Sequence, residues 1–153
     1  TNFTEAGSTE WEAYSATDAN ASQGISARVD SYSSGDASTI AWLITPPIDL
    51  TTNPSARLRF ETSNSFADGS ELEILFSKDW DGTPETISTS TWGILADAYV
   101  TQDNDYFGDW YSSGLVDLSC ENGILYIAFR YTGNGRDAND GTYELDNVKI
   151  TAV

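Results

Sequence analysis

Short runs that alternate between apolar and polar side chains dominate this chain of 153 residues. In the range 71–77, Leu72, Ile74 and Phe76 share one phase, and Glu71 and Glu73 take the other. Successive side chains of a β-strand point to opposite faces, so this pattern predicts a strand with one face on a core. No segment keeps the apolar period of an amphipathic helix. The pattern therefore predicts a chain built mainly of antiparallel β-strands.

Further short segments are β-rich and are separated by clusters of Gly, Asn, Asp, Ser and Pro, which mark turns. These predicted strands cover residues 10–15, 25–31, 41–45, 56–62, 91–96, 110–118, 124–132 and 142–152. So many short strands in one chain predict an all-β fold, a jelly-roll β-sandwich of two antiparallel sheets. With no internal repeat and no linker, residues 1–153 are expected to form a single module.

The last predicted strand changes phase partway along its length. Tyr143 and Leu145 share one phase, whereas Val148 and Ile150 share the opposite one. A β-bulge near Asp146 would reconcile the two halves, because a bulge inserts one unpaired residue into a strand. Bulges often lie beside binding sites. The alternative is a bulge that only increases the twist and leaves the carboxylate in solvent.

The charge balance narrows the range of partners. Lysine and arginine total 7 residues and aspartate and glutamate 24, which gives a formal net charge of −17. This acidity argues against nucleic acid and against anionic membrane surfaces, both of which need a basic surface. It also weighs against sulfated or uronic-acid polysaccharides, unless the arginines cluster. Arg57, Arg59 and Arg130 could line one sheet face with Tyr126 as such a basic groove, or simply pair with glutamates across neighbouring strands.

Several kinds of chemistry lack their usual residues. The chain has no histidine and a single cysteine, Cys120, which leaves no internal disulfide and neither the commonest general base nor the commonest zinc ligand. It has no nucleophile elbow, no phosphate-binding loop and no metal-hydrolase motif. No apolar run is long enough to span a membrane. We therefore expect a protein that is not an enzyme and does not insert into membranes.

Six motifs occur in a recognisable order. They are AWLITPPIDL at 41–50, FSKDWDGTPE at 76–85, STWGIL at 90–95, SSGLVDLS at 112–119, LYIAFRYTG at 125–133 and YELDNVKI at 143–150. With them the chain resembles the choice-of-anchor J or cleaved-adhesin family, jelly-roll modules similar to MAM domains in large secreted proteins of Bacteroidetes-type bacteria. The resemblance runs from about residue 24 to the end and rests before that chiefly on Phe3 and Trp11.

This resemblance implies a non-catalytic module, secreted or at the cell surface, that is attached to a larger protein. The start at Thr1, without Met, agrees with an excised piece of a longer chain. The resemblance also implies a structural calcium ion near the chain ends. Asp146 holds the place of the usual ligand, and Glu5 is the nearest candidate for its partner. Ala41 stands where many members carry an acidic residue.

Calcium prefers six to eight oxygen ligands, most of them carboxylates and carbonyls. A bulge at Asp146 would expose carbonyl oxygens beside a carboxylate, and Asp30 and Asp36 could join from the loop before the Trp42 strand. The predicted metal ligands are Asp146, Glu5, Asp30 and Asp36, for Ca²⁺ in a structural role.

Sugar binding is predicted from aromatic and polar residues in loops. Sugar rings stack on exposed aromatic faces, and neighbouring polar groups fix their hydroxyls. Trp80 lies among polar residues, an aromatic cluster follows an acidic turn near residue 105, and a polar loop runs from Asn134 to Asp140. The candidates are Trp80, Tyr106, Trp110, Tyr111, Arg136 and Asp137. The alternative is that Phe107 and Trp110 cap the core and that the other residues form solvated turns.

The predicted function is that of a monomeric carbohydrate-binding module that holds a secreted multidomain protein on a polysaccharide or surface glycan. Binding one polymer through a tethered module raises the effective concentration of the attached domain. Two alternatives remain open. One is an adhesin-type module that binds protein through a flatter patch, and the other is a spacer without a ligand.

Overall fold

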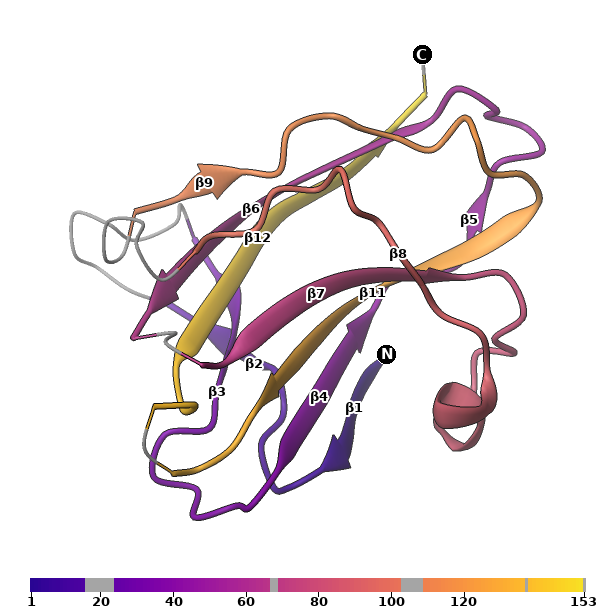
Figure 1. Ribbon diagram of the computed structural model, residues 1–153. Helices are drawn as coiled ribbons and strands as arrows, with labels where there is room; N and C mark the ends of the chain where they lie inside the picture. The colour runs from indigo at the N-terminus through magenta and orange to yellow at the C-terminus, as the bar shows by residue number, and fades with distance from the viewer. Residues whose placement is uncertain (16–23, 67–68, 103–108, 137, 153) are drawn as a thin grey trace.

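The computed structural model describes residues 1–15, 24–66, 69–102, 109–136 and 138–152. Two antiparallel sheets pack face to face (Figure 1). The first sheet has the order β1 (Asn2–Ala6), β4 (Thr39–Ile44), β11 (Ile124–Gly133), β7 (Glu71–Ser77) and β8 (Gly93–Ile94), and β5 (Ile48–Asp49) also pairs with β11. The second has the order β10 (Val116–Asp117), β6 (Arg57–Ser65), β12 (Thr142–Thr151), β3 (Ser26–Asp30) and β2 (Glu12–Tyr14), and β9 (Tyr111–Ser112) also pairs with β6. The predicted all-β sandwich is confirmed.

The main core lies between the two sheets. Leu58 and Phe60 enter it from β6, and Ile127, Phe129 and Tyr131 enter it from β11; each is at most 2% exposed. The rings of Phe60 and Phe129 meet edge to face, with centroids 5.3 Å apart. The alternating apolar residues of these strands therefore meet across the sandwich, as their phase predicts.

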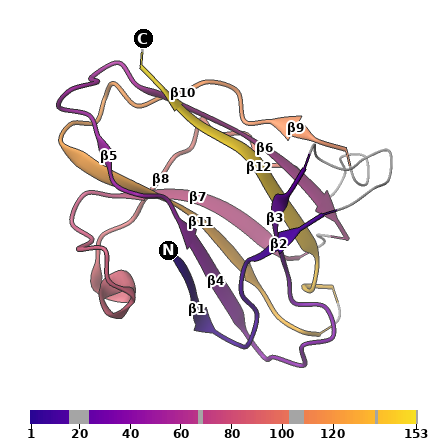
Figure 2. The same cartoon turned by 180° about the vertical axis from the view of Figure 1, so that it is seen from behind.

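A second apolar cluster covers the outer face of the first sheet. Trp42, Leu75 and Ala128 project from β4, β7 and β11, and Ile87 covers them from η1 (Pro84–Thr89), a 3₁₀ helix. Figure 1 and Figure 2 both place this helix beside the first sheet. Because β4 carries apolar residues in both phases, it needs cover on both of its faces.

The clearest alternations give the most accurate strand boundaries. β7 spans residues 71–77 as predicted, and β11 extends the prediction by one residue. The predicted strand at 110–118 is wrong in extent, because it divides into β9 and β10 around Gly114, whose φ is +74°. β1 was not expected.

The predicted bulge in the last strand is confirmed. Asp146 lies opposite Glu61, and Lys149 lies opposite Arg59, so β12 uses one more residue than β6 between these two pairs. Asn147 takes the left-handed conformation, with φ of +53°. Asparagine tolerates this conformation better than most residues do.

In the part of the chain that the structure describes, no helix has the length and apolar character that crossing a membrane would need.

Candidate functional site

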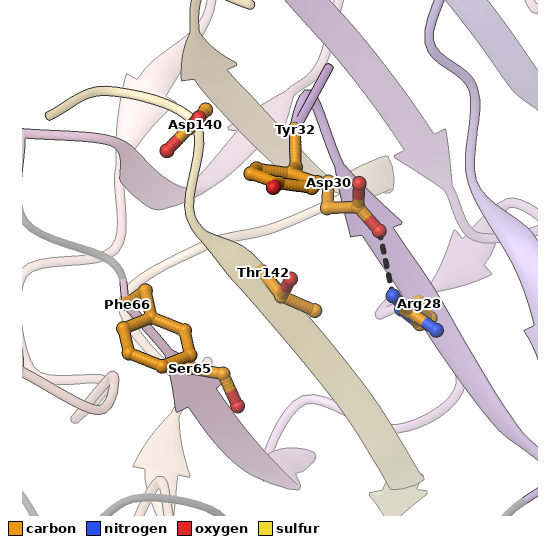
Figure 3. Close-up of a pocket in the computed structure, with 7 residues that line it drawn as sticks. All are labelled: Arg28, Asp30, Tyr32, Ser65, Phe66, Asp140 and Thr142. Atoms are coloured by element: carbon orange, nitrogen blue, oxygen red, sulfur yellow. Dashed lines mark hydrogen bonds and ion pairs between the residues drawn. The ribbon is translucent and has the colours of Figure 1, made fainter. Parts of the chain in front are cut away.

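A groove of about 490 Å³ opens on the second sheet (Figure 3). Thr142 of β12 lies opposite Asp30 of β3 on one side and opposite Ser65 of β6 on the other. The next residue, Tyr143, is buried in the core, so this row of three faces outward. The described lining residues are Arg28, Asp30, Tyr32, Ser65, Phe66, Asp140 and Thr142.

Two exposed aromatic residues flank the groove. Tyr32 follows β3 and is 71% exposed, and Phe66 follows β6 and is 75% exposed. Because β12 lies between β3 and β6, the two rings come from opposite sides of Thr142 (Figure 3). A concave surface with apolar rings and a few converging polar groups is typical of a small-ligand site.

The backbone at both rings is unusual. Phe66 has φ of +52°, and Ser33, the neighbour of Tyr32, has φ of +58°. The left-handed conformation costs an L-residue roughly 1–2 kcal/mol and is rare for a bulky side chain. Strain of this kind gathers at ligand-binding positions. The side chain of Phe66 is largely exposed, so its burial does not offset this cost. This favours a role in binding over a role in stability.

Arg28 is held firmly at one side of the groove. Its Nη2 lies 2.9 Å from Oδ2 of Asp30, in an ion pair whose side chains are 29% and 21% exposed. Its guanidinium also stacks over the ring of Tyr14, 4.6 Å from the centroid. The Nε atom is buried and has no hydrogen-bond partner among the described atoms. Arg28 is thus a fixed cation whose positive charge is already balanced by Asp30.

The outer face of the first sheet is filled by its own side chains. Trp42 is 2% exposed, its indole N–H donates to Oε2 of Glu5 at 2.8 Å, and Arg130 stacks on its ring at 5.1 Å. Arg130 also pairs with Glu73 at 2.7 Å, as the cross-strand pattern predicts. The alternative, a basic groove of three arginines, is wrong, because Arg57 and Arg59 lie on β6 of the other sheet.

The expectation that Trp80 is exposed is wrong. It is 4% exposed, and its ring meets Tyr126 at 4.7 Å and Trp92 at 5.9 Å between centroids. The indole N–H donates to the carbonyl of Thr83 at 2.8 Å, and Ser77 accepts the main-chain N–H at 3.1 Å. The loop folds back over the first sheet, so Trp80 completes an apolar cluster and presents no face to a sugar.

The other predicted sugar-binding residues lie elsewhere or outside the described residues. Tyr111 is partly exposed in β9, with its ring 6.3 Å from that of Tyr99, and Trp110 precedes it. Arg136 is exposed, and its main-chain N–H donates to Oδ1 of Asn134 at 3.0 Å. None of these three is among the described lining residues. Tyr106 and Asp137 lie outside the described residues.

The four predicted calcium ligands occupy separate places. Asp30 pairs with Arg28, Glu5 accepts from Trp42, Asp36 accepts from the main-chain N–H of Ser8 at 2.7 Å, and Asp146 accepts from Asn147 at 2.6 Å. The Ser8 hydrogen bonds hold the pKa of the Asp36 carboxyl below its usual value. Glu5 lies on the first sheet and Asp146 on the second. No group of three metal-binding side chains occurs among the described residues, so the four do not form one ligand set.

The groove was only partly visible in the sequence. The polar loop singled out there supplies Asp140, but the two rings were missed. Tyr32 and Phe66 each stand at the end of a strand, just before a glycine-containing turn. An aromatic residue in a turn-forming segment is the signal that could have identified them, since a core ring normally lies within a strand.

Solved structures share the fold at low identity. The CBM22-2 xylan-binding domain of Xyn10C from Paenibacillus barcinonensis matches with a TM-score of 0.59 and 12% identity, over 99% of this chain and 91% of that one. The K2 cleaved adhesin domain of Lys-gingipain, a protein of Porphyromonas gingivalis, matches with a TM-score of 0.56 and 15% identity, over 99% and 89%. TmCBM61, solved with β-1,4-galactotriose, matches with a TM-score of 0.52 and 16% identity, over 88% and 75%.

No family model matches the chain, and a search of curated proteins finds no match. At these identities the structural likeness concerns the fold and does not assign a function. The chain therefore shares its β-sandwich fold with carbohydrate-binding modules and with cleaved adhesin domains.

Proposed function

We propose that this chain is a non-catalytic carbohydrate-binding module and that the groove between Tyr32 and Phe66 holds the sugar. The observation that carries the proposal is the pair of exposed rings on either side of an outward row of polar side chains. A sugar ring has apolar C–H faces and polar edges. The aromatic rings suit the faces, and the row of Asp30, Thr142 and Ser65 suits the hydroxyls.

The structural neighbours support this proposal through their fold and through the sugars that two of them bind. One is named as a xylan-binding domain, and another was solved with an oligosaccharide. A module without catalytic chemistry would act by retention, because it keeps an attached protein close to its polymer and raises the effective concentration there. We place the module in a larger secreted or cell-surface protein, in line with the cleaved-adhesin resemblance.

The test is retardation of the purified chain in gels that contain single polysaccharides, followed by calorimetry on any that retard it. Tyr32→Ala and Phe66→Ala should lose retention while their melting temperatures stay close to that of the wild type, because both side chains are exposed. Tyr111→Ala is the matched control, since it removes a partly exposed ring outside the groove. The Tyr111 variant should keep full retention.

The outcomes separate the alternatives. Loss of retention only in Tyr111→Ala would place the site at the neighbouring rings of Tyr99 and Tyr111 beside β9. Absence of retention on every polymer would remove the carbohydrate proposal and favour the cleaved-adhesin alternative, in which a flatter patch binds protein.

The structural calcium ion is a separate proposal. The bulge at Asp146 supports it, because the carboxylate lies on the outer face of the second sheet beside an irregular stretch of backbone. No three metal-binding side chains come together among the described residues, so most of the oxygens would have to come from outside the predicted set.

A further inference from the structure

The charges around the groove restrict the kind of glycan that it accepts. On the proposed function, we infer that the groove takes an uncharged, hydroxyl-rich glycan and discriminates against uronic-acid and sulfated chains. The register of the second sheet brings several charged side chains together beside the groove.

Four carboxylates and one guanidinium face outward at the groove. Asp30 and Asp140 line the groove. Glu144 of β12 and Glu12 of β2 each lie opposite Arg28 of β3, so these two glutamates stand in the row next to the groove. Directly opposite residues of antiparallel strands share a face. The cation is balanced by Asp30 at 2.9 Å. The surface that a ligand meets is therefore negative.

The other cations on the strands of this sheet lie at its far end. Lys149 and Arg59 are opposite each other beyond the bulge, and Arg57 lies further on, opposite Thr151. Six residues of β12 lie between Thr142 and Lys149, one of them the extra residue of the bulge, so the two positions are roughly 20 Å apart. This exceeds the Debye length of about 8 Å at physiological ionic strength, so these cations leave the groove negative.

The hydrogen-bonding capacity of the groove points the same way. Ionised carboxylates only accept hydrogen bonds, so they need a ligand that donates them. Sugar hydroxyls donate, and bonds to an ionised acceptor are among the stronger ones. A uronate or a sulfate brings acceptors and a second negative charge to the same place. At separations of about 5 Å and an effective dielectric constant near 20, the repulsion amounts to a tenfold or larger loss of affinity.

The test uses pairs of polymers that share a backbone and differ in charge. One pair is neutral hydroxyethyl cellulose and charged carboxymethyl cellulose. The other is methyl-esterified polygalacturonic acid and the free, charged polygalacturonic acid. Gel retardation of the chain is compared within each pair at about 0.15 M salt. In any pair that retards the chain, we expect the neutral member to bind at least about tenfold more tightly. At about 1 M salt, where the Debye length is near 3 Å, this preference should shrink.

Two variants assign the preference to the groove. Asp140→Asn removes a lining charge and keeps the side-chain shape, so it should reduce the preference for the neutral member severalfold. Lys149→Gln changes a charge on the same sheet but about 20 Å from Thr142, beyond the Debye length, so it should leave the preference unchanged. A preference that Asp140→Asn does not alter would overturn the assignment.

The failures of the two proposals are distinguishable. If the charged member binds as tightly as the neutral one and Tyr32→Ala abolishes both, the carbohydrate proposal stands and the charge inference is overturned. If no polymer retards the chain, the proposed function is overturned, and this inference falls with it.

Discussion

Trp80 provides the sharpest test of how the second apolar cluster is built. The side chain is 4% exposed, packs against Trp92 and Tyr126, and donates its indole N–H to Thr83. An aromatic side chain buries about 150–250 Å², which at about 25 cal/mol per Å² corresponds to about 4–6 kcal/mol as an upper estimate. Measured losses for tryptophan to alanine are about 3–5 kcal/mol. We therefore expect Trp80→Ala to lower the free energy of unfolding by about 4 kcal/mol.

This loss is large against a total stability of about 5–15 kcal/mol. It corresponds to a fall in melting temperature of about 8–16 °C for a chain of this size. Urea denaturation followed by circular dichroism measures it, and an unchanged m value would show that the unfolded state is unaffected. Trp80→Phe is the matched control: it keeps most of the volume and should lose less. A loss below about 0.5 kcal/mol in Trp80→Ala would refute the buried position, since ordinary surface substitutions stay within that range.

Three further predictions concern the groove, the acid limit and the metal. Phe66→Asn should raise the free energy of unfolding by about 0.5–1 kcal/mol, because asparagine tolerates the left-handed backbone better than phenylalanine does. The same variant should lose retention on polysaccharide, because it removes the ring. A destabilised variant would contradict the strain argument. Hydrogen bonds from Thr86 and Thr83 hold the pKa of the Asp81 carboxyl below its unfolded value. The ionised carboxyl therefore stabilises the folded state at neutral pH, and this stabilisation is lost as the pH falls through the folded-state pKa. Between about pH 6 and 3, the melting temperature should fall less in Asp81→Asn than in the wild type. Calcium should raise the melting temperature of the wild type but not of Asp146→Ala, and equal behaviour of the two with calcium and with chelator would remove the calcium proposal.

Much of the fold could be predicted because its signals are local. The alternation in 71–77 predicts a strand with the observed boundaries, since a half-buried strand needs one apolar face. The change of phase near Asp146 predicts the bulge, because an extra residue reverses which side chains face the core. β1 was missed, since it is short and its alternation is weak.

The site could not be predicted in the same way. Tyr32, Phe66 and Asp140 are far apart in the chain and meet because β12 inserts between β3 and β6. That arrangement depends on pairing between strands that are not consecutive, which no local pattern encodes. The prediction that Trp80 is exposed is wrong for a related reason. Its polar neighbours in the sequence indicate exposure, but the loop folds over apolar residues contributed by other strands.

The sequence by itself determined that this chain forms β-strands, which residues of its clearest strands face a core, and that its charge disfavours nucleic acid. Only the tertiary structure decided which strands are neighbours, which outward residues share a row, and which aromatic rings remain in solvent. The physical reason is that alternation is set by each strand alone, residue by residue. A binding groove is set by the register between strands, which is fixed when the whole sandwich buries its core.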